Sequence, residues 1–265
     1  LNLSPTEMLK GYILSRISDT TQRTELNELW KEQIKILHEY GDTADLGFFQ
    51  SWFRGKYAES IRPGKAGSEN KDFELIGSRF HNWFKDNHKG IFNLKTSDDF
   101  YAFFKNQFPF YVKWYMKCWN AKIEFNKDLP HLHYINYWGI ADSLQDPLLL
   151  SSIKFEDEEE IIIRKLDFTA RFIETFTVRR SVNYKKFGQT SIKYTMFNLI
   201  KLIRNNDLNL LGQNLAKETF DIEQKWDAIN SFGLHGQNRK FVKRSEEHTS
   251  ELQSRRNLVC RLLLE

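Results

Sequence analysis

The chain has 265 residues, which is long enough to bury a sizeable core. Its formal net charge is +4 and its pI is near 8.8. With only 13 Gly and 5 Pro, the composition argues against hairpin-rich all-β folds and glycine-rich linkers. The aromatic load of 22 Phe, 10 Tyr and 7 Trp excludes disorder for most of the chain. The small net charge permits contact with nucleic acid but does not require it.

The sequence carries no sign of an extracellular or membrane protein. Two cysteines, Cys118 and Cys260, cannot build a disulfide framework, and no apolar run approaches the roughly 18 residues of a membrane helix. The opening segment has neither a signal-peptide nor a transit-peptide pattern. We therefore expect a cytoplasmic protein with no membrane partner. Because the first residue is Leu1 rather than Met, we also expect a fragment of a larger protein.

Apolar residues recur at helical spacing through most of the chain, whereas alternating strand patterns, phosphate-binding glycine motifs and internal repeats are absent. Ser4 to Glu7 has the pattern of a capping box, with Pro5 in the first turn, and Gly41 stands where a left-handed cap is expected. Pro109 is predicted to kink or split the longest helix. These signals predict an all-α, irregular multi-helix fold of about eight to ten helices. The expected helices cover residues 5–17, 19–40, 46–61, a stripe through 73–84, 97–125, 155–182, 191–204 and 208–229, with a loop over 62–70.

The last 22 residues, 244–265, differ from the rest because they contain none of the aromatic side chains. The string RSEEHTSELQS within them resembles the conceptual translation of a sequencing-adapter oligonucleotide. We therefore expect this segment to be foreign to the native fold, which would leave Cys260 and His248 without a biological role. The alternative is an amphipathic C-terminal helix in which Leu258 and Leu262 share a face.

The histidine and cysteine positions give no metal or nucleophile pattern. His131 and His133 could place two imidazoles on one side of an extended segment, but no third ligand is near, and the H-E-x-x-H and C-x-x-C patterns are absent. We therefore expect a structural role for these histidines and no metal site. Cys118 lies between Trp114 and Trp119 in an apolar helix, so we expect it in the core.

One cluster interleaves basic and aromatic residues around the end of the helix expected over 155–182. This composition suits phosphate contact combined with base stacking. The alternative is an ordinary solvated helix end and its loop. The candidate nucleic-acid-binding residues are Arg171, Arg179, Arg180, Lys185, Lys186, Lys193 and Tyr184, with Phe187 and Tyr194 interleaved.

The opening segment LNLSPTEMLKGYILSRI has the pattern L-x-L-[ST]-P-x-E-x-L-K-x-Y. It resembles the segment that follows the ParB/sulfiredoxin-like nucleotide-binding domain in GmrSD-type modification-dependent restriction endonucleases. The resemblance extends to Lys243 and divides the chain into 1–17, the end of the nucleotide-binding region, and 18–243, a helical middle domain. Its strongest residues are Leu3, Ser4, Glu7, Leu9, Lys10 and Tyr12, with further signal around 172–184 and 236–243.

For a full-length family member, the resemblance implies nucleotide- and metal-dependent cleavage of DNA with modified cytosines, in defence against phage. The D-G-Q-Q-R motif of the N-terminal domain and the HNH-like motif of the C-terminal nuclease are both missing here. No catalytic residue is therefore carried over, and no cofactor is expected in this chain itself. We expect a non-catalytic helical region that positions the missing N- and C-terminal domains of the same polypeptide and contacts DNA weakly. The alternative is a stand-alone helical module that binds nucleic acid or protein.

Overall fold

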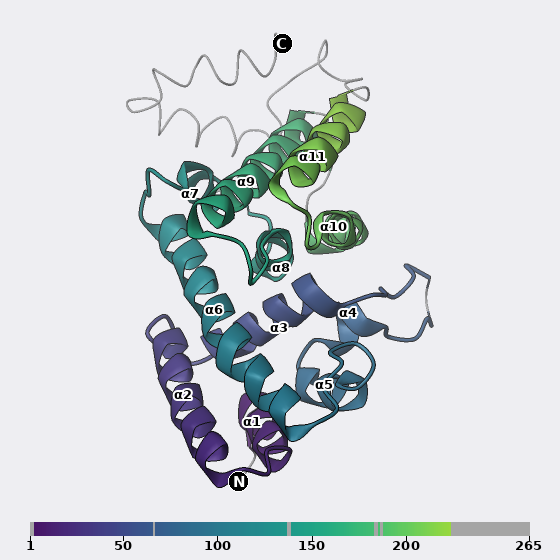
Figure 1. Cartoon of the computed structure of the whole chain (residues 1–265). Helices are drawn as coiled ribbons and strands as arrows, with labels where there is room; N and C mark the ends of the chain where they lie inside the picture. The colour runs from purple at the N-terminus through teal and green to yellow at the C-terminus, as the bar shows by residue number, and fades with distance from the viewer. Residues whose placement is uncertain (1–2, 66, 137–138, 183–184, 186–187, 224–265) are drawn as a thin grey trace.

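The computed structural model describes residues 3–65, 67–136, 139–182, 185 and 188–223. These residues form eleven helices and no strand, which confirms the all-α prediction and slightly exceeds the expected number of helices (Figure 1). The adapter interpretation of 244–265 and the end of the helix expected over 208–229 lie outside the described residues. The helices are α1 (Pro5–Ser15), α2 (Thr20–His38), α3 (Ala44–Tyr57), α4 (Asp72–Leu75), α5 (Phe80–Asn87), α6 (Ser97–Ile123), α7 (Pro130–Ile135), α8 (Asp142–Ser152), α9 (Glu159–Val182), α10 (Gln189–Ile203) and α11 (Leu208–Glu223).

Side-chain caps begin the first two helices, and the sequence predicts the first of them. The Ser4 hydroxyl accepts a 3.1 Å hydrogen bond from the Glu7 amide, and the Asp19 carboxylate accepts a 2.7 Å bond from the Gln22 amide. Gly41 follows α2 with a φ of +144°, which favours glycine but lies far from the left-handed helical value of about +57°. The expected left-handed cap is therefore wrong in its geometry, although a glycine is required there.

α6 is one continuous helix of 27 residues, so Pro109 does not split it. The helix begins at a capping box, in which Thr96 accepts from the Asp99 amide at 3.2 Å and Asp99 accepts from the Thr96 amide at 2.7 Å. Directly before the proline, the Phe108 ring is fully buried among other rings. Its centre lies 6.3 Å from the centre of the Trp52 ring. Tertiary packing on this face therefore holds the helix together although Pro109 removes one backbone hydrogen bond.

Two further parts of the chain differ from the sequence-based expectation. The stripe over 73–84 forms two short helices, α4 and α5, because the chain turns between Ile76 and Arg79. The sequence did not predict α7 or α8. In α8, every residue from Leu144 to Ser152 is buried, which removes the polar face that would have identified an amphipathic helix.

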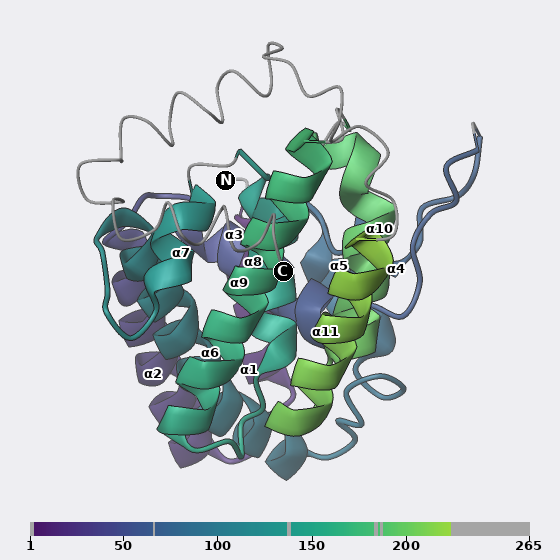
Figure 2. The same ribbon diagram turned by 90° about the horizontal axis from the view of Figure 1, so that it is seen from above.

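α6 crosses the molecule and joins its two ends (Figure 1). α1, α2 and α5 lie around its first half, whereas α7, α9 and α11 lie beyond its second half. α9 and α11 run side by side in both views, and the chain between α3 and α4 extends outward as the predicted loop (Figures 1 and 2). One core of stacked and tilted rings runs through the middle. The centre of the Trp30 ring lies 5.4 Å from that of Phe49 and 4.8 Å from that of Phe108.

α3 and α8 cross closely at the centre of the molecule. A Cβ at Gly55 would stand 2.6 Å from the Pro147 carbonyl oxygen, so only glycine permits this approach. The crossing brings the last turn of α3 beside the last turn of α8, where Lys56 donates to the carbonyls of Ser151 and Ile153.

Candidate functional site

The structure separates the basic cluster that the sequence brought together. Arg179 is only 2 % exposed, and its Nη1 donates a 2.6 Å hydrogen bond to the Thr219 carbonyl, which ties α9 to α11. Its guanidinium is therefore directed into the fold, so the expectation that it contacts DNA phosphate finds no support in this arrangement.

Lys193 also faces protein rather than solvent. Its Nζ forms an ion pair with the Glu74 carboxylate of α4 and lies 5.8 Å from the centre of the Phe73 ring. The neighbouring Tyr194 is 62 % exposed. Lys193 thus joins α10 to α4, at a different place from the end of α9.

Three of the expected residues stand on the surface around the second half of α9. Arg171 and Lys185 are exposed, and the half-buried Arg180 guanidinium lies 5.4 Å from the Phe176 ring centre. Burial lowers the pKa of Arg180 from its usual value. Lys186, Tyr184 and the interleaved Phe187 lie outside the described residues.

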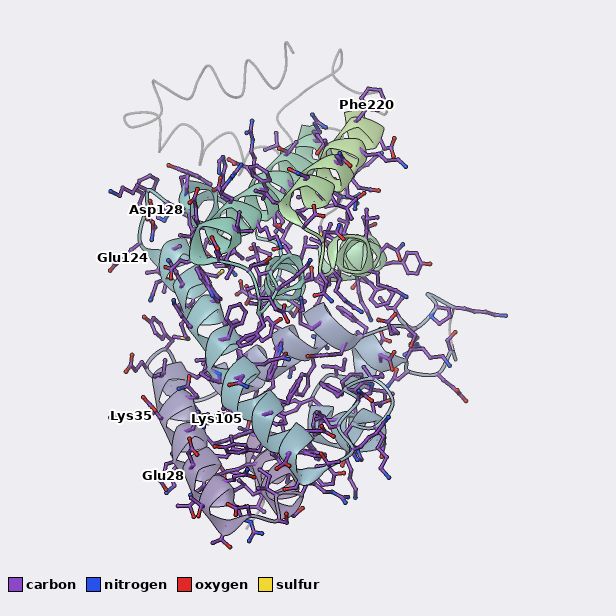
Figure 3. The ribbon with its side chains drawn as sticks, viewed as in Figure 1. Glu28, Lys35, Lys105, Glu124, Asp128 and Phe220 are labelled. Carbon is purple, nitrogen blue, oxygen red and sulfur yellow. The ribbon has the colours of Figure 1, made fainter. Side chains whose placement is uncertain are left out.

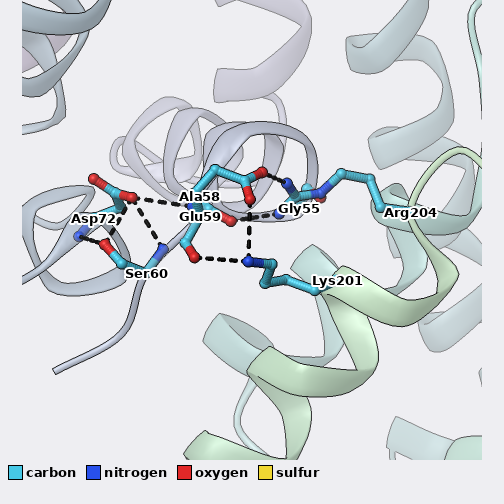
Figure 4. Close-up of polar contacts among 7 residues, drawn as sticks. All are labelled: Gly55, Ala58, Glu59, Ser60, Asp72, Lys201 and Arg204. Atoms are coloured by element: carbon cyan, nitrogen blue, oxygen red, sulfur yellow. Dashed lines mark hydrogen bonds and ion pairs between the residues drawn. The ribbon is translucent and has the colours of Figure 1, made fainter. Parts of the chain in front are cut away.

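A polar junction that no sequence motif indicated joins α3 to α10 (Figure 4). Arg204 donates to the carbonyls of Gly55 at 2.9 Å and Ala58 at 2.6 Å, and its Nη1 pairs with the Glu59 carboxylate. Lys201 donates to the Glu59 carbonyl at 2.9 Å and pairs with its carboxylate at 3.1 Å. These two cations cap the carbonyl end of α3 from a helix that lies more than a hundred residues later in the chain.

Asp72 completes the same junction from the opposite side (Figure 4). Its carboxylate accepts from the backbone amides of Glu59 and Ser60, both at 3.0 Å, and from Trp83 Nε1 at 3.0 Å. Burial raises the pKa of Asp72, but the hydrogen bonds from Trp83 and Ser60 outweigh it and hold the pKa below its ordinary value. The sequence signal was present only as single charged residues with no recognisable spacing.

Lys56 makes the reciprocal contact, from α3 to the carbonyl end of α8. Its Nζ donates to the carbonyls of Ile153 at 2.6 Å and Ser151 at 3.4 Å, and to Asn205 Oδ1 at 2.5 Å. Burial, together with the nearby Arg204 charge, lowers the pKa of Lys56 to about 7. A cavity of about 390 Å³ lies beside it. In its protonated form the Lys56 amine directs its three N–H groups to these three oxygens, so it holds the helix ends rather than facing the cavity.

His131 and Cys118 both have structural surroundings in the fold. His131 Nδ1 lies 2.8 Å from Asp167 Oδ1, which ties α7 to α9 and gives this histidine the expected structural role. Cys118 is 3 % exposed, and burial raises the pKa of its thiol to about 12, which confirms its place in the core. Within the described part of the chain, no three His, Cys, Asp or Glu side chains gather to hold a metal ion.

None of the described helices is long and apolar enough to cross a bilayer. Comparisons of the chain with protein-family models, with curated proteins and with solved structures found no match.

Proposed function

We propose that this chain is the non-catalytic helical region of a GmrSD-like restriction endonuclease, where it positions nucleotide-binding and HNH-like nuclease domains that act on modified DNA. The observation that carries the proposal is the polar junction, which locks α3 to α10 across the shared core. The assignment to this family rests on the resemblance of the opening segment. A cytoplasmic location follows from the same proposal.

A positioning domain needs internal rigidity, because any bending within it would displace the domains that it joins. The junction supplies this rigidity through short hydrogen bonds to backbone carbonyls, which fix helix ends rather than mobile side chains. The aromatic core supplies the remainder, since Trp30, Trp52 and Trp114 are essentially inaccessible to solvent. Both features connect segments that are far apart in the sequence.

The same proposal includes a weak DNA contact through Arg171, Arg180 and Lys185. Each phosphate that they neutralise adds about 0.9 to the slope of log affinity against log salt, so three contacts give a slope of roughly −2 to −3. We expect weak, sequence-independent binding to duplex DNA. The measurement is fluorescence anisotropy of a labelled duplex over a salt series, with the parent chain and the R171Q/R180Q/K185Q variant.

A charge-matched control separates a local contact from the effect of net charge. The K35Q/K85Q/K105Q variant removes the same charge; Lys35 and Lys105 lie on the α2 and α6 side, away from α11 (Figure 3). We expect the first variant to flatten the salt slope and the control to retain it. Identical slopes for both variants would remove DNA contact from the proposal.

The non-catalytic part has its own test. Incubated with plain or glucosylated phage DNA, Mg²⁺ or Mn²⁺ and a series of nucleotides, the chain is expected to leave the DNA intact. Reproducible nicking that a single substitution abolishes would refute the proposed role.

A further inference from the structure

A second pocket lies where the turn after α2, the start of α3, α6 and α8 meet. Its volume is about 230 Å³, which is below the usual range for drug-sized ligands and suits a small group. It is separate from the α3–α10 junction, and neither the resemblance nor the proposed function uses it. The lining residues that carry chemistry are Tyr40, Tyr115, Trp119, Asp142, Ser143 and Asp146.

Three aromatic rings form one side of this pocket. The Tyr40 and Trp119 ring centres are 6.2 Å apart with their planes at 64°, and the Tyr115 and Trp119 centres are 6.4 Å apart at 41°. Because the planes are strongly inclined, the rings border the space from different directions. Tyr40 is 37 % exposed, which leaves its side of the pocket open to solvent.

The other side carries an excess of negative charge. Lys122 Nζ lies 2.8 Å from Asp142 Oδ1 and forms a second ion pair with Asp146. Two carboxylates thus share one ammonium, which leaves a formal charge of −1. Both carboxylates line the pocket; the Asp142 side chain is 58 % exposed, whereas Asp146 is nearly buried at 7 %.

Two of the three rings are largely covered by the fold. Tyr115 is only 5 % exposed, and the indole nitrogen of Trp119 is buried without a hydrogen-bond partner among the described residues. A cation in the pocket would therefore meet the rings rather than their polar atoms.

We propose that this pocket binds an alkylated ammonium group. Aromatic faces attract a weakly hydrated organic cation, and the shared carboxylates supply the opposite charge. A hard metal ion would need more oxygen ligands than the partly engaged Asp142 and Asp146 provide. A neutral polar ligand would not compensate the formal negative charge of the carboxylates.

Titration calorimetry with choline and with tetramethylammonium tests the proposal on the whole chain. The matched control is the neutral carbon isostere of choline, in which a tert-butyl group replaces the trimethylammonium. We expect both cations to bind and the isostere to bind at least about threefold more weakly, since it lacks the cation–π attraction. Equal binding of the isostere would overturn the proposal.

A trimethyl-lysine peptide and its unmethylated counterpart distinguish the source of the cation. Tighter binding of the methylated peptide than of tetramethylammonium would assign the group to a protein side chain. Equal affinities would assign it to the ammonium alone. Binding of the unmethylated peptide as tightly as the methylated one would contradict recognition of the alkylated group.

Substitutions locate the binding to this pocket. Tyr40→Leu is expected to weaken choline binding about three- to thirtyfold, and Asp142→Asn about two- to fivefold. Tyr194→Leu on α10 and Asp98→Asn at the start of α6 remove the same groups elsewhere and should leave the affinity unchanged. Circular dichroism checks that each variant is folded. Unchanged affinity in both pocket variants would show that the pocket is not the site.

Discussion

The two ends of α8 are each held by a buried lysine, yet the two lysines have opposite surroundings. Lys122 reaches from α6 to the start of α8 and meets the carboxylates of Asp142 and Asp146. Lys56 reaches from α3 to the end of α8 and meets neutral carbonyl oxygens. Their exposed fractions are similar, at 4 % and 7 %. Burial alone therefore does not determine the protonation of either amine.

The charge of the partner decides the direction of each shift. Burial opposes the charged form of both lysines, but the two carboxylates outweigh it and raise the pKa of Lys122 above its usual value. At Lys56 the neutral acceptors compensate less, and the positive charges of Arg204 and Lys165 act in the same direction as burial, so the pKa falls to about 7. One end of α8 is thus held by an ion pair and the other by an amine that titrates near neutral pH.

Removing the ion pair is expected to have the largest effect. Lys122→Met leaves the buried Asp146 carboxylate without its cation, which should lower the free energy of unfolding by about 3–5 kcal/mol. Urea unfolding of the parent and variant measures the loss. The K122M/D146L double variant removes both charges and should recover part of the stability. A loss below about 1 kcal/mol in the single variant would show that the pair is not a buried one.

Removing the other lysine is expected to have a smaller effect. Lys56→Met leaves the Ser151 and Ile153 carbonyls at the end of α8 without their donor, which should cost about 1–3 kcal/mol of unfolding free energy. Lys35→Met on the exposed face of α2 is the matched control and should change stability little. Equal stability of the K56M variant and the parent would refute the role of Lys56 as a helix cap.

Much of the fold could be predicted because its helices carry local signals. The cap at Ser4 and the apolar stripes were visible in the sequence, and α1 and α2 begin within a residue or two of their expected starts. α8 could not be predicted in the same way, because its residues from Leu144 to Ser152 are buried on every face and show no amphipathic period. At Pro109, burial of the neighbouring rings outweighs a local helix breaker, so only tertiary contacts decide the outcome.

The surface chemistry was less predictable, since charged residues acquire their roles from partners far away in the chain. Proximity in sequence placed Arg179 in a basic cluster, but its partner is Thr219 on α11. The pocket between α6 and α8 joins Tyr40 to Asp142, which are about a hundred positions apart and share no motif. The sequence shows which charged and aromatic residues are present, but it does not show which of them become neighbours in the fold.

The pH dependence of stability provides the finest test of the contrast between the two lysines. From about pH 7 up to the ordinary lysine value of 10.5, the unfolded chain keeps the Lys56 proton while the folded chain releases it. The folded state then binds fewer protons, so this group makes the unfolding free energy rise with pH, by at most about 1.4 kcal/mol per pH unit. Lys122 has a raised folded pKa, so its contribution is fully present below its unfolded pKa and falls only as the pH rises above it.

Urea unfolding between about pH 6 and pH 9 distinguishes the pH dependence that each lysine gives to the unfolding free energy. The stability deficit of Lys56→Met relative to the parent should grow as the pH rises above neutrality, because the variant lacks the group that favours folding there. The deficit of the K122M/D146L double variant should stay constant over the same interval, since Lys122 of the parent remains charged in both states and the variant has no buried carboxylate at position 146 to titrate. Parallel curves for the parent and Lys56→Met would mean that the three oxygens around Lys56 keep its amine charged, and that the two ends of α8 are held by the same kind of contact.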